Sequence, residues 1–252
     1  MVTRLHRDHR KVVGDLQDLL IVGMTQAQRI TAGHAHLHLT QGVGRRIGIL
    51  KKTLEEIFRL FPPQRTETLD REDLTTVQIH LHAFVINLSG VFDNWAWAYL
   101  LRHGLVERVG NRRNVGMFIR RTQDLLPATL REYLQSEQIA TWHESYLKLY
   151  RDTLAHRIPL YIPPAAWTDD DAAKYRTLEE EKIRLIQAAD WQKLDEVWAE
   201  QDRLGRACHS FLHEAVAGGD SRPMYLHPQV LCDGMTVVEF GNKFYLEWHG
   251  HT

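Results

Sequence analysis

The spacing of apolar residues predicts helices over the first third of the chain. Near-helical spacing predicts one helix over residues 3–22 and a long second helix over residues 25–60, which Pro62-Pro63 ends. Glycines around residues 42–44 weaken the intrinsic helix propensity. We therefore expect the second helix either to break there or to pack closely against a neighbouring element.

A third helix is predicted over the most apolar stretch of the sequence. Asp70 or Asp73 can cap its N-terminus, and Gly104 follows its C-terminus. Its apolar residues fall on most sides of the helix. We expect such a helix at the centre of a bundle.

Helical spacing continues in the second half of the chain. Pro159, Pro163 and Pro164 are predicted to stop one of these helices, because proline cannot continue it. The helices predicted here are residues 123–135, 137–157, 169–189 and 190–217.

The pattern changes after Gly218-Gly219. Three short runs, MYLHPQVLC, MTVVEF and KFYLEW, are separated by Asp233-Gly234 and Gly241-Asn242, each of which suits a two-residue hairpin turn. The sequence therefore predicts an all-α helical bundle with a small C-terminal antiparallel β meander. The expected segments are residues 1–62, 68–220 and 223–252.

Composition narrows the class of protein. Hydrophobic residues at 44% and charged residues at 25% are typical of a globular protein. Asp15 and Asp18 interrupt the only apolar run near the N-terminus, and Cys208 and Cys232 form no CxxC motif. We expect a cytoplasmic protein without a membrane partner. The chain contains no P-loop, dinucleotide-binding, HExxH or GxSxG motif.

Arginines are unevenly distributed although the net charge is only −1. We interpret Arg112 and Arg113 as candidate phosphate-contacting residues, with a solvated surface cluster as the alternative. The whole cluster comprises Arg108, Arg112, Arg113, Arg120 and Arg121.

Fifteen histidines raise the possibility of a metal site. His34 and His38, and likewise His209 and His213, are four residues apart, which places two imidazoles on one face of a helix. Neither pair has a third ligand at a characteristic spacing, so we expect no metal and no other cofactor. A metal-binding bundle remains an alternative.

The segment LYRDTLAHRIP carries the strongest chemical signal. Asp152 and His156 are four residues apart, so the carboxylate can orient the imidazole. The long side chain of Arg151 can reach the same helix end. A guanidinium beside an imidazole suits metal-free cleavage of a phosphodiester. A helix-terminal ion pair without chemistry is the alternative.

These residues resemble the motif of the HEPN superfamily: an arginine, a polar residue, and a histidine a few positions later. Arg151, Asp152 and His156 match it position by position, and the resemblance covers roughly residues 70–165. It implies an all-α up-and-down helical bundle, to which the N-terminal helices over residues 1–62 are extra, often as a homodimer whose two motifs face one cleft. It also implies, as in many members, metal-independent endoribonuclease activity that produces a cyclic phosphate.

The resemblance leaves two functions open. The first is RNA cleavage with Arg151, Asp152 and His156 as the catalytic residues, for instance in a toxin-antitoxin system. The second is a non-catalytic HEPN-type module that binds nucleotides or proteins, or that dimerises. Asp93 and Asn94 occupy a helix on which such proteins often carry polar residues near the site. We therefore expect them to contact substrate, with polar contacts inside the bundle as the alternative.

Overall fold

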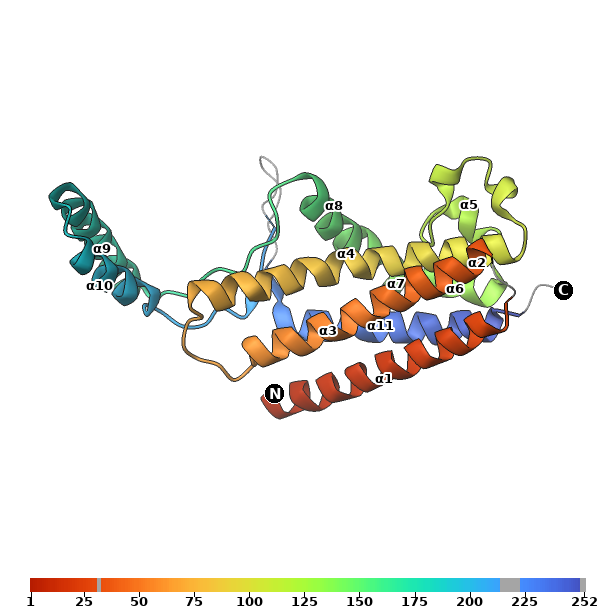
Figure 1. The fold of residues 1–252 in the computed structure, drawn as a ribbon, viewed down its shortest axis with the longest axis horizontal. Coiled ribbons are helices and arrows are strands. Elements are labelled where there is room, and N and C mark those ends of the chain that lie inside the picture. The colour runs from red at the N-terminus through yellow and green to blue at the C-terminus, as the bar shows by residue number, and fades with distance from the viewer. Residues whose placement is uncertain (31–32, 214–222, 250–252) are drawn as a thin grey trace.

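The computed structural model describes residues 1–30, 33–213 and 223–249. The chain is mostly helical and has one small antiparallel sheet, in which β1 (Ser210–Phe211) pairs with β2 (Met224–Tyr225). Long helices lie side by side in a bundle (Figure 1). They are α1 (Val2–Gln28), α3 (Arg45–Leu60), α4 (Arg71–Arg102) and α11 (Leu226–Glu247).

The second predicted helix is divided. After α1 ends at Gln28, α2 (His34–Leu37) continues through the π-helical turn η1 (His38–Gly44) into α3. The expectation of close packing near residue 42 is confirmed, because a Cβ on Gly42 would lie 2.7 Å from Cγ of Asn94 on α4.

Helix α4 lies at the centre of the bundle, as its apolar composition predicts. Asp70 caps it by accepting a hydrogen bond from the backbone N–H of Asp73 at 2.8 Å, and Gly104 follows its end with φ +66°. Trp95 and Tyr99 are completely buried. By length and composition α4 could cross a membrane, a criterion that the core helix of a soluble bundle also meets. No other helix in the described ranges meets it.

The predicted C-terminal meander is wrong beyond its first two residues. Met224 and Tyr225 form β2, but residues 226–247 form the single helix α11. Gly234 and Gly241, which suggested hairpin turns, are instead points of close helix packing. A Cβ on either would lie 2.7 Å from a side chain of α1, Val12 for the former and Leu19 for the latter. Tertiary packing therefore overrides the β propensity of these residues.

The main hydrophobic core draws residues from all three predicted segments, from Val12 to Trp248. The helical stretch predicted over residues 137–157 is confirmed, with one π-helical turn in its middle. This part of the chain comprises η2 (Val106–Val109), η3 (Arg112–Asn114), α5 (Arg120–Gln123), α6 (Ala128–Gln135), α7 (Glu137–Trp142), η4 (His143–Leu147) and α8 (Lys148–His156).

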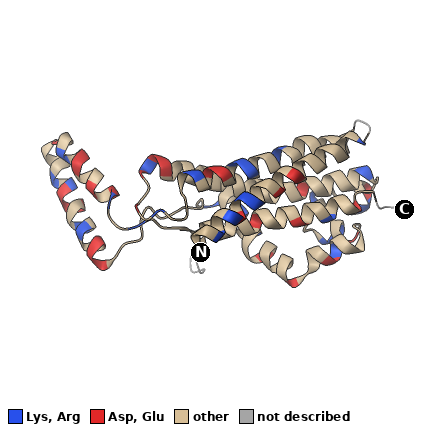
Figure 2. Cartoon of the chain, turned by 90° about the horizontal axis from the view of Figure 1, so that it is seen from below, with Lys and Arg blue, Asp and Glu red and all other residues tan. Residues whose placement is uncertain are grey.

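Helices α9 (Asp169–Ala188) and α10 (Trp191–Asp202) form a hairpin that extends from the end of the bundle (Figure 1). Acidic and basic residues alternate along it (Figure 2). The helix predicted over residues 190–217 ends early, at Asp202, and Gly205 follows with φ +83°.

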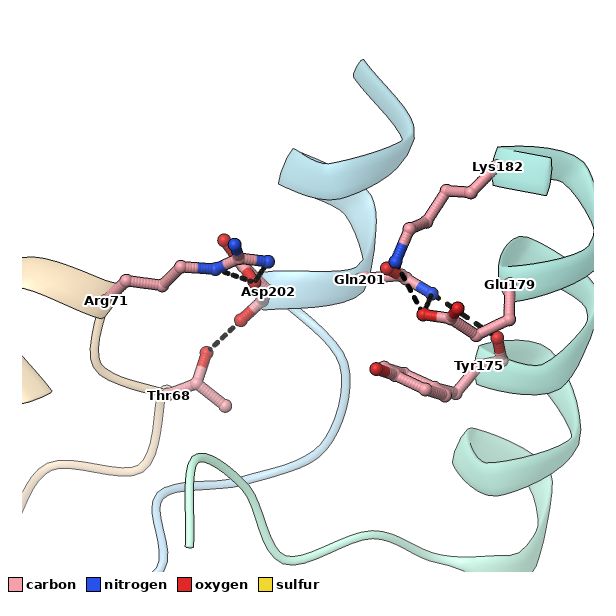
Figure 3. Close-up of polar contacts among 7 residues, drawn as sticks. All are labelled: Thr68, Arg71, Tyr175, Glu179, Lys182, Gln201 and Asp202. Carbon is pink, nitrogen blue, oxygen red and sulfur yellow. Dashed lines mark hydrogen bonds and ion pairs between the residues drawn. The ribbon is translucent and has the colours of Figure 1, made fainter. Parts of the chain in front are cut away.

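Polar contacts anchor this hairpin to the start of α4 (Figure 3). Thr68 donates a hydrogen bond to the Asp202 carbonyl at 2.6 Å, and the Arg71 guanidinium contacts the Asp202 carboxylate at 3.2 Å. Within the hairpin, Glu179 accepts a hydrogen bond from Gln201 at 2.9 Å. These contacts join the hairpin to the bundle at the N-terminal end of α4.

Candidate functional site

The residues of the HEPN-like motif occupy the last two turns of α8. The helix ends at His156, and Arg157 is already in extended conformation, two residues before Pro159. His156 is exposed, whereas Arg151 and Asp152 are half-buried. The imidazole is therefore accessible to a ligand at the C-terminus of a helix.

Arg151 pairs with its sequence neighbour. Its Nε lies 3.1 Å from Oδ1 of Asp152, and the two side chains are 41% and 37% exposed. The contact has the distance of an ion pair without the angles of a hydrogen bond. Among the described residues, nothing accepts a hydrogen bond from this buried Nε. Its Nη groups make no hydrogen bond within the described structure, so the guanidinium retains donor capacity toward a ligand.

The expected contact between Asp152 and His156 does not occur among the residues that the structure describes, which show no hydrogen bond or ion pair joining them. The carboxylate turns toward Arg151 instead. In this conformation Asp152 orients the arginine rather than the imidazole.

The chain around α8 runs antiparallel to α4. The Trp142 ring lies 5.8 Å from the Phe92 ring, whereas beyond α8 the Leu160 carbonyl accepts a hydrogen bond from His82 at 2.6 Å, and Gln78 accepts one from the backbone N–H of Ile162. These contacts place α8 alongside the middle of α4. Asp93 and Asn94 directly follow Phe92, so they lie level with Trp142, on the side of this stretch where the chain leads into α8.

Asp93 is a second carboxyl group that interacts electrostatically with Arg151. Its carboxyl remains exposed to solvent on one side but is surrounded by protein atoms on others, and this partial burial raises its pKa. Arg151 from α8 and Arg46 from α3 act in the opposite direction. Two guanidinium groups from different helices thus flank one carboxyl group, and neither forms an ion pair with it in the described structure.

Asn94 faces the opposite side of the site. Its Oδ1 accepts a hydrogen bond from Arg46 Nε at 2.8 Å, and its Nδ2 lies 3.3 Å from Nδ1 of His38. Arg46 was not a sequence-derived candidate, since neither a motif nor a local spacing connects it with residues of α4.

His143 is a second residue that the sequence did not indicate. Its ring stacks on Phe118 with centroids 3.9 Å apart, and its Nδ1 lies 3.2 Å from the Glu144 carboxylate. Burial lowers its pKa, against the opposing effect of Glu144, and Arg151 lowers it further. His143 is therefore a neutral imidazole near Arg151 at neutral pH.

The arginine cluster lies in the connection that follows α4. Arg112 and Arg113 are exposed, and no ion pair in the described ranges involves either of them, whereas Arg120 pairs with Asp124. The connection approaches the site at Gly116, where a Cβ would lie 3.2 Å from Oδ1 of Asp93. The structure brings this connection close to Asp93 without a direct contact between its arginines and α8.

The histidine pairs gain no third ligand. No group of three or more His, Cys, Asp or Glu side chains suited to a metal occurs within the described ranges. His38 stacks on Trp97, and His209 donates a hydrogen bond to the Arg65 carbonyl at 2.8 Å. The helix predicted to carry His209 and His213 is absent, since both lie beyond the end of α10.

Comparisons with known proteins give no relative: no protein-family model, curated protein or solved structure matches this chain. The residues of the site itself therefore provide the support for a function.

Proposed function

We propose that this protein is a metal-independent endoribonuclease of HEPN type, with Arg151 and His156 as its catalytic residues. The observation that supports this best is the end of α8, where an exposed imidazole follows a half-buried guanidinium whose Nη groups make no hydrogen bond in the described structure. An RNA phosphate can accept hydrogen bonds from these Nη groups.

The reaction needs only groups that these side chains and the substrate contain. An imidazole removes the proton from the ribose 2′-hydroxyl, and the 2′-oxygen attacks the adjacent phosphorus. Arg151 stabilises the additional negative charge on the phosphorane. The bond from phosphorus to the 5′-oxygen then breaks, and this oxygen takes up a proton. The products carry a 2′,3′-cyclic phosphate and a 5′-hydroxyl.

One imidazole cannot be free base and protonated acid in the same step. We therefore propose a two-fold homodimer in which His156 of each protomer faces a shared cleft, so that one removes the proton and the other donates one. Asp152 positions the Arg151 guanidinium in this scheme, and Arg112 and Arg113 contact phosphates farther along the RNA.

Product analysis tests the proposed reaction. The purified protein is incubated in EDTA with a single-stranded RNA and with the same strand carrying a 2′-deoxyribose at the main cleavage position. We expect a cyclic phosphate end from the RNA and no cleavage at the modified position. Cleavage of the 2′-deoxy bond, or loss of activity in EDTA, would contradict the mechanism.

A non-catalytic HEPN-type module is the second candidate. The ion pair between Arg151 and Asp152 favours it, because a structural role would use the arginine in this way. Under this alternative the protein binds RNA or nucleotides and leaves the chain intact in the same assay.

A further inference from the structure

A groove of about 460 Å³ opens between the η1–α3 segment and α4. Arg45, Arg46 and His38 line one side of it, and Asn87 and Asn94 line the other. The described lining contains no Asp or Glu side chain, and neither arginine belongs to an ion pair in the described ranges. The groove therefore concentrates positive charge in a protein whose net charge is −1.

Arg46 is held in place by neutral groups. Its Nε donates a hydrogen bond to Asn94 Oδ1 at 2.8 Å, and its Nη1 donates one to Asn87 Oδ1 at 3.0 Å. Asn87 is itself fixed, because its Nδ2 donates to the Ala83 carbonyl at 2.7 Å. Two carboxamides thus orient the guanidinium without neutralising its charge. Its Nη2 makes no hydrogen bond within the described structure.

A glycine makes this arrangement possible. Gly90 lies one turn from Asn87 and one turn from Asn94 on α4, and a Cβ there would lie 2.4 Å from Cζ of Arg46. Any larger residue would displace the guanidinium from both carboxamides. The close approach of α3 to α4 at this point is therefore tied to the position of the Arg46 charge.

The groove adjoins the candidate catalytic site. Asp93 lies next to Asn94 and is influenced by Arg46 and by Arg151. Figure 1 shows α3 and α8, which carry these arginines, on different sides of α4. The two arginines carry one positive charge more than the single Asp93 carboxylate on which both act, so a net positive charge remains around this part of α4.

We propose that Arg46 and its groove bind a backbone phosphate of the RNA next to the phosphate held by Arg151. This inference rests on the proposed function and adds a substrate-binding subsite from a helix outside the region that resembles the HEPN superfamily. A guanidinium suits this role because its fixed N–H groups match the geometry of phosphate oxygens.

Binding to a labelled single-stranded RNA tests the proposal in the His156→Ala protein, which separates binding from cleavage. Arg46→Gln is expected to weaken binding about tenfold at low salt and to reduce the slope of log K against log[KCl] by about 0.7, the value for one phosphate contact on a single strand. Asn94→Asp is expected to act similarly, because a carboxylate would neutralise Arg46 while preserving its hydrogen bonds.

Arg10→Gln is the matched control. Arg10 is exposed on α1 and lies outside the groove lining, and its replacement changes the net charge by the same amount. We expect the control to bind RNA as the His156→Ala protein does. Circular dichroism of each variant verifies that the helical fold is retained.

Three results would overturn the subsite. In the first, Arg46→Gln and Asn94→Asp bind RNA like the control. In the second, the His156→Ala protein binds no RNA. In the third, a nucleoside monophosphate binds in an Arg46-dependent way while RNA binding does not depend on Arg46. Failure of the proposed function can be distinguished from failure of the subsite. In that case the His156→Ala protein still cleaves RNA, whatever the effect of Arg46→Gln on RNA binding.

Discussion

Asp233 is a buried carboxylate that links α11 to the helical segment leading into α8. Its replacement tests how much this link contributes to the stability of the bundle. It is completely buried, and its oxygens accept hydrogen bonds from Trp142 at 2.9 Å, Tyr146 at 2.7 Å and Gln229 at 2.9 Å. Trp142 and Tyr146 belong to α7 and η4, which continue into α8. Burial raises the pKa of Asp233 to about 6 despite these hydrogen bonds.

The raised pKa determines the sign of the pH effect. In the unfolded chain the pKa of Asp233 is near its ordinary 3.8, so between about pH 4 and pH 6 the folded protein binds the proton more tightly. The free energy of unfolding therefore falls as the pH rises through this window. A difference of about two pKa units corresponds to about 3 kcal/mol.

Asp233→Asn keeps the shape and removes the charge. The amide oxygen can accept from Trp142 and Gln229, and the amide nitrogen can donate to the Tyr146 oxygen. We expect the stability of the variant relative to the wild type to rise by about 2 to 3 kcal/mol between pH 4 and pH 8. Urea unfolding followed by tryptophan fluorescence measures this, and other titrating groups cancel in the comparison.

A relative stability that does not change with pH would refute this account of Asp233. Asp233→Ala serves as the control for hydrogen bonding. It leaves the buried Tyr146 hydroxyl without its acceptor, at a cost of about 1–3 kcal/mol, and the half-buried donors of Trp142 and Gln229 lose theirs as well. It should therefore be less stable than Asp233→Asn at every pH.

Three further predictions concern assembly, the arginine cluster and helix packing. Light scattering should give twice the chain mass, and a monomer throughout the micromolar range would exclude a shared cleft. Replacing both Arg112 and Arg113 with Ala should weaken RNA binding for all sequences alike and flatten its salt dependence. An unchanged salt dependence would show that these arginines are solvated surface residues without a phosphate contact. Gly241→Ala should destabilise the fold by about 1–3 kcal/mol in urea unfolding, because its Cβ would lie 2.7 Å from Leu19. Gly48→Ala is the control and should not destabilise it, because its Cβ meets nothing within 4 Å. Equal effects of the two substitutions would contradict the packing of α11 on α1.

Local signals made the helical part of the fold predictable. The cap at Asp70 and the apolar run after it identified α4, and Pro159 marked the end of α8. The error at α11 has a physical cause. Asp233-Gly234 and Gly241-Asn242 are strong turn signals in isolation, but both glycines fit against α1, a contact that no local pattern reveals.

The candidate site was predictable only where its residues share one helix. Arg151, Asp152 and His156 fall on α8 by sequence spacing alone, although the pairing of Asp152 with Arg151 rather than with His156 depends on side-chain conformation. Arg46 is 48 residues from Asn94, and their contact requires the register between α3 and α4. Only the folded chain supplies that register.

The rate of RNA cleavage by Arg151 and His156 variants tests the central claim most directly. His156→Ala and Arg151→Ala should each lower the single-turnover rate in EDTA by at least about a hundredfold while circular dichroism remains unchanged. His80 is a half-buried histidine on α4 that is not part of the proposed catalytic pair. The control variant His80→Ala makes the same substitution at that position and should cleave RNA like the wild type. If His156→Ala cleaves RNA at the wild-type rate, the account is contradicted, and the end of α8 has no catalytic role.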